Sequence, residues 1–207
     1  MKAGREYGRV ATMLNAGDSM AHAMFAFGQC MSGEHEGAMR TAAKAVALNP
    51  NNSWAQGMRG GSLAYSGYPG EAIPYLQQAM RLSPVEPLLW VWSHMSATAY
   101  FFHGDYEAGL AAGKDLVRAV PNAVFGYRHC LATLVGLGRM AEAAYYADTI
   151  YTRFPKEIAG FMAMQVHWGE WREADHAIYV ETLAKGGLVL RDGVLGRVAP
   201  LLPDTRG

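Results

Sequence analysis

The sequence carries few charges and lacks long apolar segments. Lys and Arg together number 18, as do Asp and Glu, so the formal net charge is zero. Binding of nucleic acid or of an anionic membrane requires clustered positive charge, and no run of like charges occurs, so we expect neither partner. No apolar stretch reaches the ~18 residues of a membrane-spanning helix, and the signal-peptide pattern is missing at the start. We therefore expect a cytoplasmic protein.

Cysteine is scarce, and motifs for metal binding or catalysis are missing. Cys30 and Cys130 lie far apart, which predicts two small buried side chains in a reducing compartment. The histidines show no metal-ligand spacing such as HExxH. Neither a GxSxG motif nor a phosphate-binding loop ending in GK[ST] occurs. We predict no catalytic residue, no metal and no cofactor, and we expect that the chain is not an enzyme.

Glycine, alanine and methionine are abundant, and glycine and proline recur with a fixed period. Prolines that would end a helix stand at Pro50, Pro84, Pro121 and Pro155, with spacings of 34, 37 and 34. Glycines at Gly33, Gly67, Gly104 and Gly138 repeat the same spacings. Two independent markers with one period predict an array of repeats.

Other positions of the repeat agree once each proline is placed at position 32, so that repeats begin at Ser19, Ser53, Trp90 and Val124. Position 8 holds Ala26, Gly60, Ala97 and Leu131, position 20 holds Ala38, Ala72, Gly109 and Ala143, and position 27 holds Ala45, Ala79, Leu116 and Ile150. Small residues at positions 8 and 20 are typical of closely crossing helices. We predict that each repeat has a first helix (helix A) ending at a glycine with positive φ, and a second (helix B) ending before the proline.

This pattern resembles the tetratricopeptide repeat (TPR) family, which has small residues at positions 8 and 20 and proline at position 32. The resemblance implies an all-α, right-handed α-solenoid with C-terminal capping helices. The four repeats would span 19–52, 53–86, 90–123 and 124–157, within the matching segment 19–155. Gln56 at position 4 and Arg59 at position 7 depart from the family pattern, and Pro87 lies in a lengthened turn.

The segment before the first complete repeat continues the same register. Gly4, Gly8 and Ala11 fall at positions 20, 24 and 27 of a preceding partial repeat, 1–18, whose helix A is missing. We expect a helix B with an uncovered apolar face, as in the C-terminal part of a longer array or multidomain protein. The alternative is an N-terminal capping helix.

Two further segments follow the repeats. Residues 158–187 are predicted to form capping helices that shield the last repeat, with Ala174, Ile178 and Leu183 on one face. Gly186 and Gly187 end this region. Residues 188–207 are predicted to be an apolar tail that docks back or frays.

The TPR resemblance implies a concave groove lined by positions 2, 5, 6, 9, 12 and 13 of the A helices. The predicted partner-binding groove consists of Met20, Met24, Phe27, Met31, Trp54, Met58, Tyr65, His94, Met95, Phe101, Phe102, Phe125, Arg128 and His129. Methionine and aromatic side chains suit an apolar peptide or an amphipathic helix. Since only three of these residues can donate to a terminal carboxylate, we predict no carboxylate clamp. The alternative is that these side chains pack between neighbouring A helices or are covered by the tail.

The segment 48–84, LNPNNSWAQGMRGGSLAYSGYPGEAIPYLQQAMRLSP, is similar to the C-terminal TPR regions of proteobacterial class III adenylate cyclases and of related winged-helix regulators. The resemblance implies a bacterial regulatory or assembly module, although no catalytic or DNA-binding residue of those families is present. Three functions stay open: a protein-interaction scaffold, a homo-oligomerisation module, and the regulatory region of a nucleotide cyclase.

Overall fold

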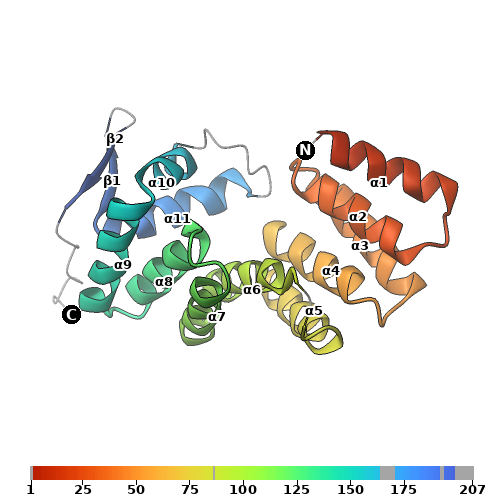
Figure 1. Ribbon diagram of the computed structural model, residues 1–207, viewed down its shortest axis with the longest axis horizontal. Coiled ribbons are helices and arrows are strands. Elements are labelled where there is room, and N and C mark those ends of the chain that lie inside the picture. Colours follow the sequence, from red (N-terminus) through yellow and green to blue (C-terminus); the bar gives the residue numbers. More distant parts are fainter. Residues whose placement is uncertain (1, 86, 164–170, 192–193, 199–207) are drawn as a thin grey trace. The chain divides into compact units, whose positions relative to one another are not determined.

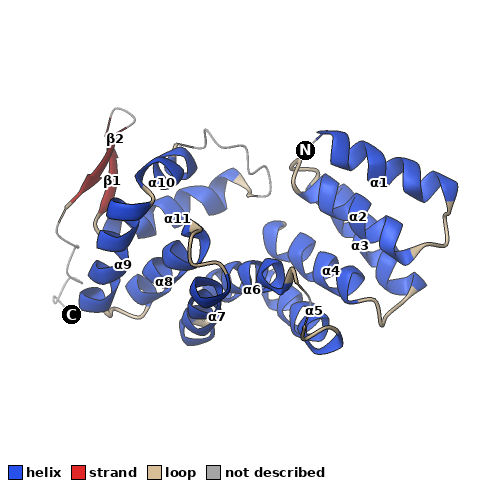
Figure 2. Ribbon diagram, in the orientation of Figure 1, coloured by secondary structure: helices blue, strands red, loops and turns tan. Residues whose placement is uncertain are grey.

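The computed structural model describes residues 2–85, 87–163, 171–191 and 194–198. The chain divides into two compact units. Unit 1 comprises Met1–His103 with Trp168–Arg172, and unit 2 comprises Gly104–His167 with Glu173–Gly207. The division falls at Gly104, inside the third predicted repeat. Figure 2 shows that helices make up nearly all of the described chain, as the all-α prediction requires.

Unit 1 is built from helices that follow one another closely in sequence and in space (Figure 1). Its helices are α1 (Lys2–Leu14), α2 (Ser19–Cys30), α3 (His35–Leu48), α4 (Ser53–Tyr65), α5 (Pro69–Leu82) and α6 (Leu89–His103). Helix α2 packs on α3 and α4 packs on α5, so the first two predicted hairpins are present.

Unit 2 contains helices and one short antiparallel hairpin. Its elements are α7 (Tyr106–Ala119), α8 (Val124–Gly136), α9 (Met140–Arg153), α10 (Pro155–Met162), α11 (Glu173–Lys185), β1 (Leu188–Arg191) and β2 (Val194–Arg197). Helices α8 and α9 form the fourth predicted hairpin, and Leu188 of β1 pairs with Arg197 of β2.

The repeat markers act on the backbone as predicted. The four glycines at the period of the repeat, Gly33, Gly67, Gly104 and Gly138, have φ values of 76°, 88°, 86° and 70°. A residue with a Cβ is strained in this region, so glycine ends helix A at the lowest cost. The B helices α3, α5, α7 and α9 each end two residues before the proline of their repeat.

Small residues allow the helices of a hairpin to cross closely. A Cβ placed on Gly60 of α4 would lie 2.9 Å from the carbonyl oxygen of Ala72 and 2.6 Å from Cγ of Leu76, both on α5. Position 27, which faces the next repeat, is fully buried in Ala45, Ala79, Leu116 and Ile150. Larger side chains at such sites force backbone shifts that typically cost about 1–3 kcal/mol.

A chain of hydrogen bonds connects the first two repeats. Asn52 caps α4 by accepting from the backbone N–H groups of Trp54 and Ala55 at 3.0 and 3.3 Å. Its side-chain Nδ2 donates to Oγ of Ser19 at 3.0 Å, and that hydroxyl donates to the carbonyl of Ala45 at 2.9 Å. The start of one helix A is thereby bonded to the start of the next.

Helix α1 packs against α2 in the manner of a B helix. A Cβ on Gly8 would lie 2.6 Å from Cα of Phe25, and a Cβ on Gly28 would lie 2.6 Å from Cα of Arg5. Gly113 of α7, at the same repeat position as Gly8, also lies close to the next helix A: a Cβ there would be 3.0 Å from Sγ of Cys130 on α8 and 3.1 Å from its backbone nitrogen. The register of the repeats therefore extends back into α1.

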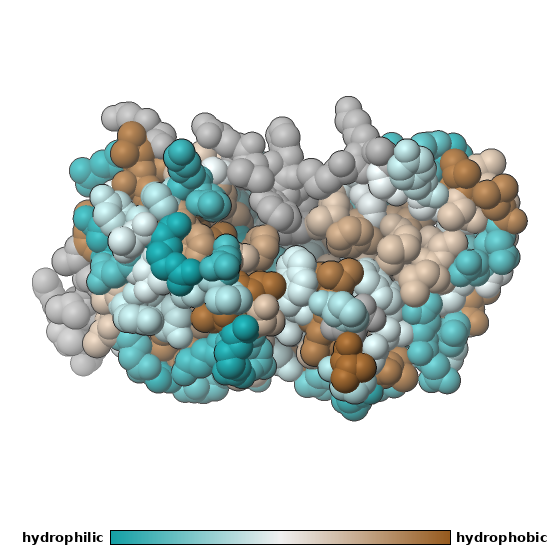
Figure 3. Space-filling model, viewed as in Figure 1, coloured by the Kyte–Doolittle hydropathy of each residue, from teal (hydrophilic) through white to brown (hydrophobic). Residues whose placement is uncertain are grey.

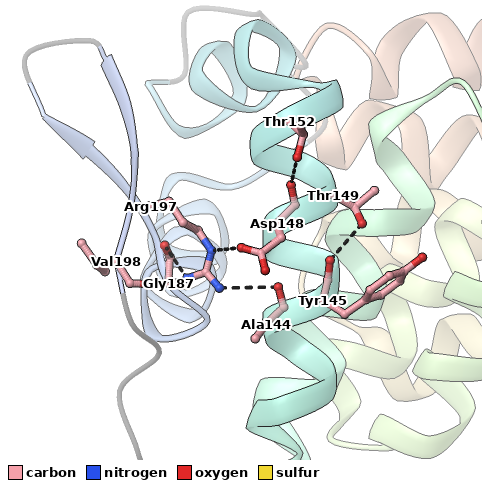
Figure 4. Close-up of polar contacts among 8 residues, drawn as sticks. All are labelled: Ala144, Tyr145, Asp148, Thr149, Thr152, Gly187, Arg197 and Val198. Carbon is pink, nitrogen blue, oxygen red and sulfur yellow. Dashed lines mark hydrogen bonds and ion pairs between the residues drawn. The ribbon is translucent and has the colours of Figure 1, made fainter.

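The sequence analysis named no strands here, yet in the C-terminal segment β1 and β2 pair antiparallel, and β2 contacts α9 and α10. Arg197 fastens it to α9: its Nε lies 2.8 Å from Oδ1 of Asp148, and its Nη2 lies 3.5 Å from the carbonyl of Ala144 (Figure 4). Nη1 donates to the carbonyl of Gly187 at 3.3 Å. Residues 199–207 lie outside the described residues.

The cysteines, the length of the helices and the grouping of possible metal ligands bear on the search for a site. Cys30 and Cys130 are buried and are not joined in a disulfide, and burial raises the pKa of the Cys130 thiol to about 11, so this thiol stays protonated at neutral pH. Within the described ranges, no helix is both long and apolar enough to cross a membrane. Among the same residues, no three His, Cys, Asp or Glu side chains gather as metal ligands.

Candidate functional site

The predicted groove residues come from four A helices. Helix α2 contributes Met20, Met24, Phe27 and Met31; α4 contributes Trp54, Met58 and Tyr65; α6 contributes His94, Met95, Phe101 and Phe102; and α8 contributes Phe125, Arg128 and His129. Helices α2, α4 and α6 belong to unit 1 and α8 belongs to unit 2, so each set is described within its own unit.

Along α2 the predicted groove residues are at least partly accessible. Met20 is 42% exposed, and Met24, Phe27 and Met31 are half-buried. Their spacing of four, three and four residues places them in one stripe along the helix and its C-cap. Trp54 of α4 is half-buried as well. These five residues, which we call the α2 stripe, form the accessible part of the predicted groove.

Between α4 and α6 the predicted groove is closed. Met58 and Met95 are each 2% exposed, and His94 and Phe101 are also buried. The cause is that two glycines of α4 leave room for large side chains of α6: the indole of Trp92 packs against Gly57, and the thioether of Met95 packs against Gly61. At this junction the side chains pack between neighbouring A helices, which is the alternative considered from the sequence.

Trp92 is a residue that the groove prediction missed. Its ring is fully buried and meets the ring of Trp54 edge-on, with centroids 4.8 Å apart. A usable signal was present in the sequence, because Gly57 and Gly61 lie one turn apart on α4 and leave room for two large side chains from a neighbouring helix.

Trp171 was also missed, and it lies on the predicted groove residues at the end of α4 and α6. It is 5% exposed, and its ring centroid lies 6.1 Å from that of Tyr65 and 5.6 Å from that of Phe102. Phe101 meets Phe102 edge-on at 5.0 Å. No local pattern indicates this contact, because Trp171 is distant in sequence from Tyr65 and Phe102.

In unit 2, α10 and α11 cover the predicted groove residues of α8. The guanidinium of Arg128 is 4.1 Å from the ring centroid of Phe161 on α10 and 5.7 Å from that of Tyr179 on α11. The Tyr179 hydroxyl lies 2.8 Å from Nδ1 of His129. Arg128 and His129 are buried, and Phe125, whose ring is 5.7 Å from the Arg128 guanidinium, is half-buried.

The face of α11 that packs inward is not the predicted one. Ile178 is 51% exposed and Ala174 is exposed as well, so of the three predicted residues only Leu183 is buried. The buried face instead contains polar side chains that find partners. Nε2 of His176 donates to the carbonyl of Phe161 at 2.6 Å, and this bond compensates for part of the desolvation of the ring.

The comparisons with known proteins define the fold. No protein-family model matches the chain. A search of curated proteins finds no match either. Among solved structures, PilW, a type IV pilus biogenesis factor, superposes with a TM-score of 0.64 at 15% identity, covering 83% of this chain and 79% of PilW.

Two further structures support the same conclusion. YrrB, described as a TPR protein with an unusual peptide-binding site, gives a TM-score of 0.59 at 18% identity over 88% of this chain and 93% of its own. MamA from Desulfovibrio magneticus RS-1 gives 0.58 at 17% identity, over 81% and 92%. The chain has the fold of a TPR-like α-solenoid.

The burial of Met95 leads to a prediction. Met95→Glu should lower the free energy of unfolding by about 3 kcal/mol or more, because a carboxylate would replace a thioether in a dry contact between helices. Met20→Glu on α2, a matched change at an exposed site, should alter it by less than about 0.5 kcal/mol. Urea unfolding followed by circular dichroism measures both. Equal stability of the two variants would show that Met95 faces solvent.

His176 leads to a second prediction. Burial lowers the pKa of His176, and the nearby Arg128 cation lowers it further, against the opposing effect of the Phe161 carbonyl. In the unfolded chain the histidine pKa is about 6.5, so the unfolded chain binds the proton more readily than the folded one. The free energy of unfolding should therefore fall as the pH drops below that value. His176→Gln keeps a donor for the carbonyl without titrating. The free energy of unfolding, measured between neutral and mildly acidic pH, should depend less on pH in this variant; an unchanged dependence would contradict the assignment.

Proposed function

We propose that the chain is a protein-interaction scaffold that binds an apolar peptide or an amphipathic helix along the α2 stripe. The observation that carries this proposal is the exposure of the four stripe residues that belong to α2 and its C-cap: Met20, Met24, Phe27 and Met31 stay accessible, whereas Met58 of α4 and Met95 of α6, at the same repeat position as Met24, are buried. The fold supports the proposal because YrrB, with the same fold, is described as having a peptide-binding site.

The chemistry of the stripe indicates the kind of ligand. Methionine has a flexible, polarisable side chain that adapts to differently shaped apolar partners, and Trp54 adds a flat aromatic surface at one edge. A helix that presents apolar residues at intervals of three and four can lie along such a stripe. The three residues that could donate to a terminal carboxylate, His94, Arg128 and His129, are all buried, which supports the prediction of no carboxylate clamp.

The proposal predicts which substitution abolishes binding. Peptides selected against the folded protein from a displayed library of random sequences should bind at least about tenfold more weakly to Met24→Glu, because the new charge would be desolvated under an apolar ligand. Ala47→Glu, on an exposed site of α3, is the matched control and should bind as the wild type does. Fluorescence anisotropy with the labelled peptides measures both. Unchanged binding by Met24→Glu would refute the α2 stripe as the site.

A second candidate is self-association through α1, because its side chains form an exposed apolar surface. Tyr7 and Leu14 are 74% and 84% exposed, and Val10 and Met13 are exposed as well. Figure 3 shows the hydrophobic surface at the C-terminal end of α1. At the repeat position of Val10 the other B helices carry polar residues: Lys44, Gln78, Asp115 and Thr149. An exposed apolar face of this kind suits an isologous contact with a second copy.

Self-association predicts a concentration-dependent mass. Sedimentation equilibrium should show a dimer that Leu14→Glu converts to a monomer, because a charge at the centre of an apolar contact is costly. Ile178→Glu on α11 changes an exposed apolar residue elsewhere and should leave the dimer intact. A wild-type protein that is monomeric at every concentration would exclude this candidate.

The regulatory region of a nucleotide cyclase stays a prediction from the resemblance of residues 48–84. The structural comparisons support the TPR-like fold of this segment and carry no information about such a parent protein. A regulatory region of this kind would use the same α2 stripe to contact its target.

A further inference from the structure

Unit 1 already holds one aromatic side chain on the surface where the sequence places a ligand. Trp171 lies against Tyr65 at the end of α4, with ring centroids 6.1 Å apart and the rings tilted, and against Phe102 at the end of α6, with centroids 5.6 Å apart and the rings edge-on. Tilted and edge-on arrangements at these distances are the favoured geometries of aromatic pairs. We call Tyr65, Phe101 and Phe102 the aromatic seat.

The residue after Trp171 makes a second contact with the same end of α4. The guanidinium of Arg172 lies over Gly67, which occupies the positive-φ turn just after α4. A side chain at Gly67 would displace it, so the glycine leaves room for the cation as well as ending the helix. The C-terminal end of a helix carries partial negative charge, and a cation there is stabilised.

The two contacts together describe a recognition pattern. Trp171 supplies a large flat ring to an aromatic surface, and the adjacent Arg172 supplies a cation to a helix C-terminus. Trp171 and Arg172 lie outside α10 and α11, and both belong to unit 1 with the residues they contact. Tyr65 and Phe102 lie at position 13 of their repeats, one of the positions predicted to face a ligand.

We propose that the aromatic seat of unit 1 is a binding site for a peptide segment that carries tryptophan followed by a basic residue, and that Trp171 and Arg172 are its internal occupants. This inference rests on the proposed scaffold function and names the chemistry of its partner. A partner segment of this kind competes with Trp171, which is present at the high effective concentration of a tethered group. Removal of the internal tryptophan therefore uncovers the site.

The test uses the full chain and a labelled peptide, acetyl-Trp-Arg-Glu-Ala-amide, which has the sequence of residues 171–174. Trp171→Ala should bind this peptide at least about tenfold more tightly than the wild type, because the tethered competitor is gone. The peptide with alanine in place of tryptophan should not bind. Fluorescence anisotropy gives the affinities, and circular dichroism confirms that each variant is folded.

Two further variants keep the inference falsifiable if Trp171→Ala proves unstable. Trp171→Phe retains a smaller ring in the seat and should give an intermediate gain in affinity. Adding Phe102→Ala to Trp171→Ala or to Trp171→Phe should remove the gain, since the seat itself is damaged. A folded variant at Trp171 that binds the peptide no better than the wild type, or equally well without Phe102, would overturn the proposal.

The outcome is separable from the test of the α2 stripe. Peptides selected on the wild-type protein depend on Met24, which lies outside the aromatic seat. If those peptides bind as proposed while the tryptophan peptide does not, the scaffold function stands and the aromatic seat is only a structural contact. If the tryptophan peptide alone binds, the seat is a site and the α2 stripe is not.

Discussion

The close crossing of helices at residues without a large side chain is the constraint on which the rest of this structure depends. Gly60 allows α4 to lie almost against the backbone of α5, and Gly8 does the same for α1 and α2. Because the backbones approach this closely, the residues buried between the two helices of a hairpin are small, and they bury little apolar area. Larger side chains are then concentrated on the A helices, where they must either pack against a neighbour or face a ligand.

Whether the large side chains of the A helices are buried or accessible differs along the chain. At the junction of α4 and α6, the glycines Gly57 and Gly61 admit Trp92 and Met95, and the surface closes. Along α2 the methionine and phenylalanine side chains stay partly accessible. At the aromatic seat and on α8 the surface is covered by aromatic side chains from later in the sequence. The same type of position therefore has three outcomes, decided by what lies opposite it.

Much of the fold could be predicted because its causes are local. A glycine needed for positive φ and a proline that cannot continue a helix act on their own residue and its neighbours, so Gly67 and Pro84 mark helix ends without knowledge of tertiary contacts. The capping face of α11 was predicted wrongly for the opposite reason. Its burial of His176 rather than Ile178 depends on a carbonyl of α10, and an apolar pattern alone cannot indicate a hydrogen bond to another element. The paired strands β1 and β2 were not predicted, although the sequence contains the dipeptide Asp192-Gly193, which is typical of tight turns.

The sequence by itself determined the period of the repeats, the ends of their helices and the methionine and aromatic character of the A helices. Only the tertiary structure decided which of these side chains remain available to a partner. The physical reason is that exposure depends on side chains that approach from elsewhere in the chain: Met95 is buried by a glycine of another helix, and Tyr65 is covered by Trp171. A repeat pattern indicates which residue types line the A helices, whereas contacts between residues distant in sequence decide whether those side chains are covered.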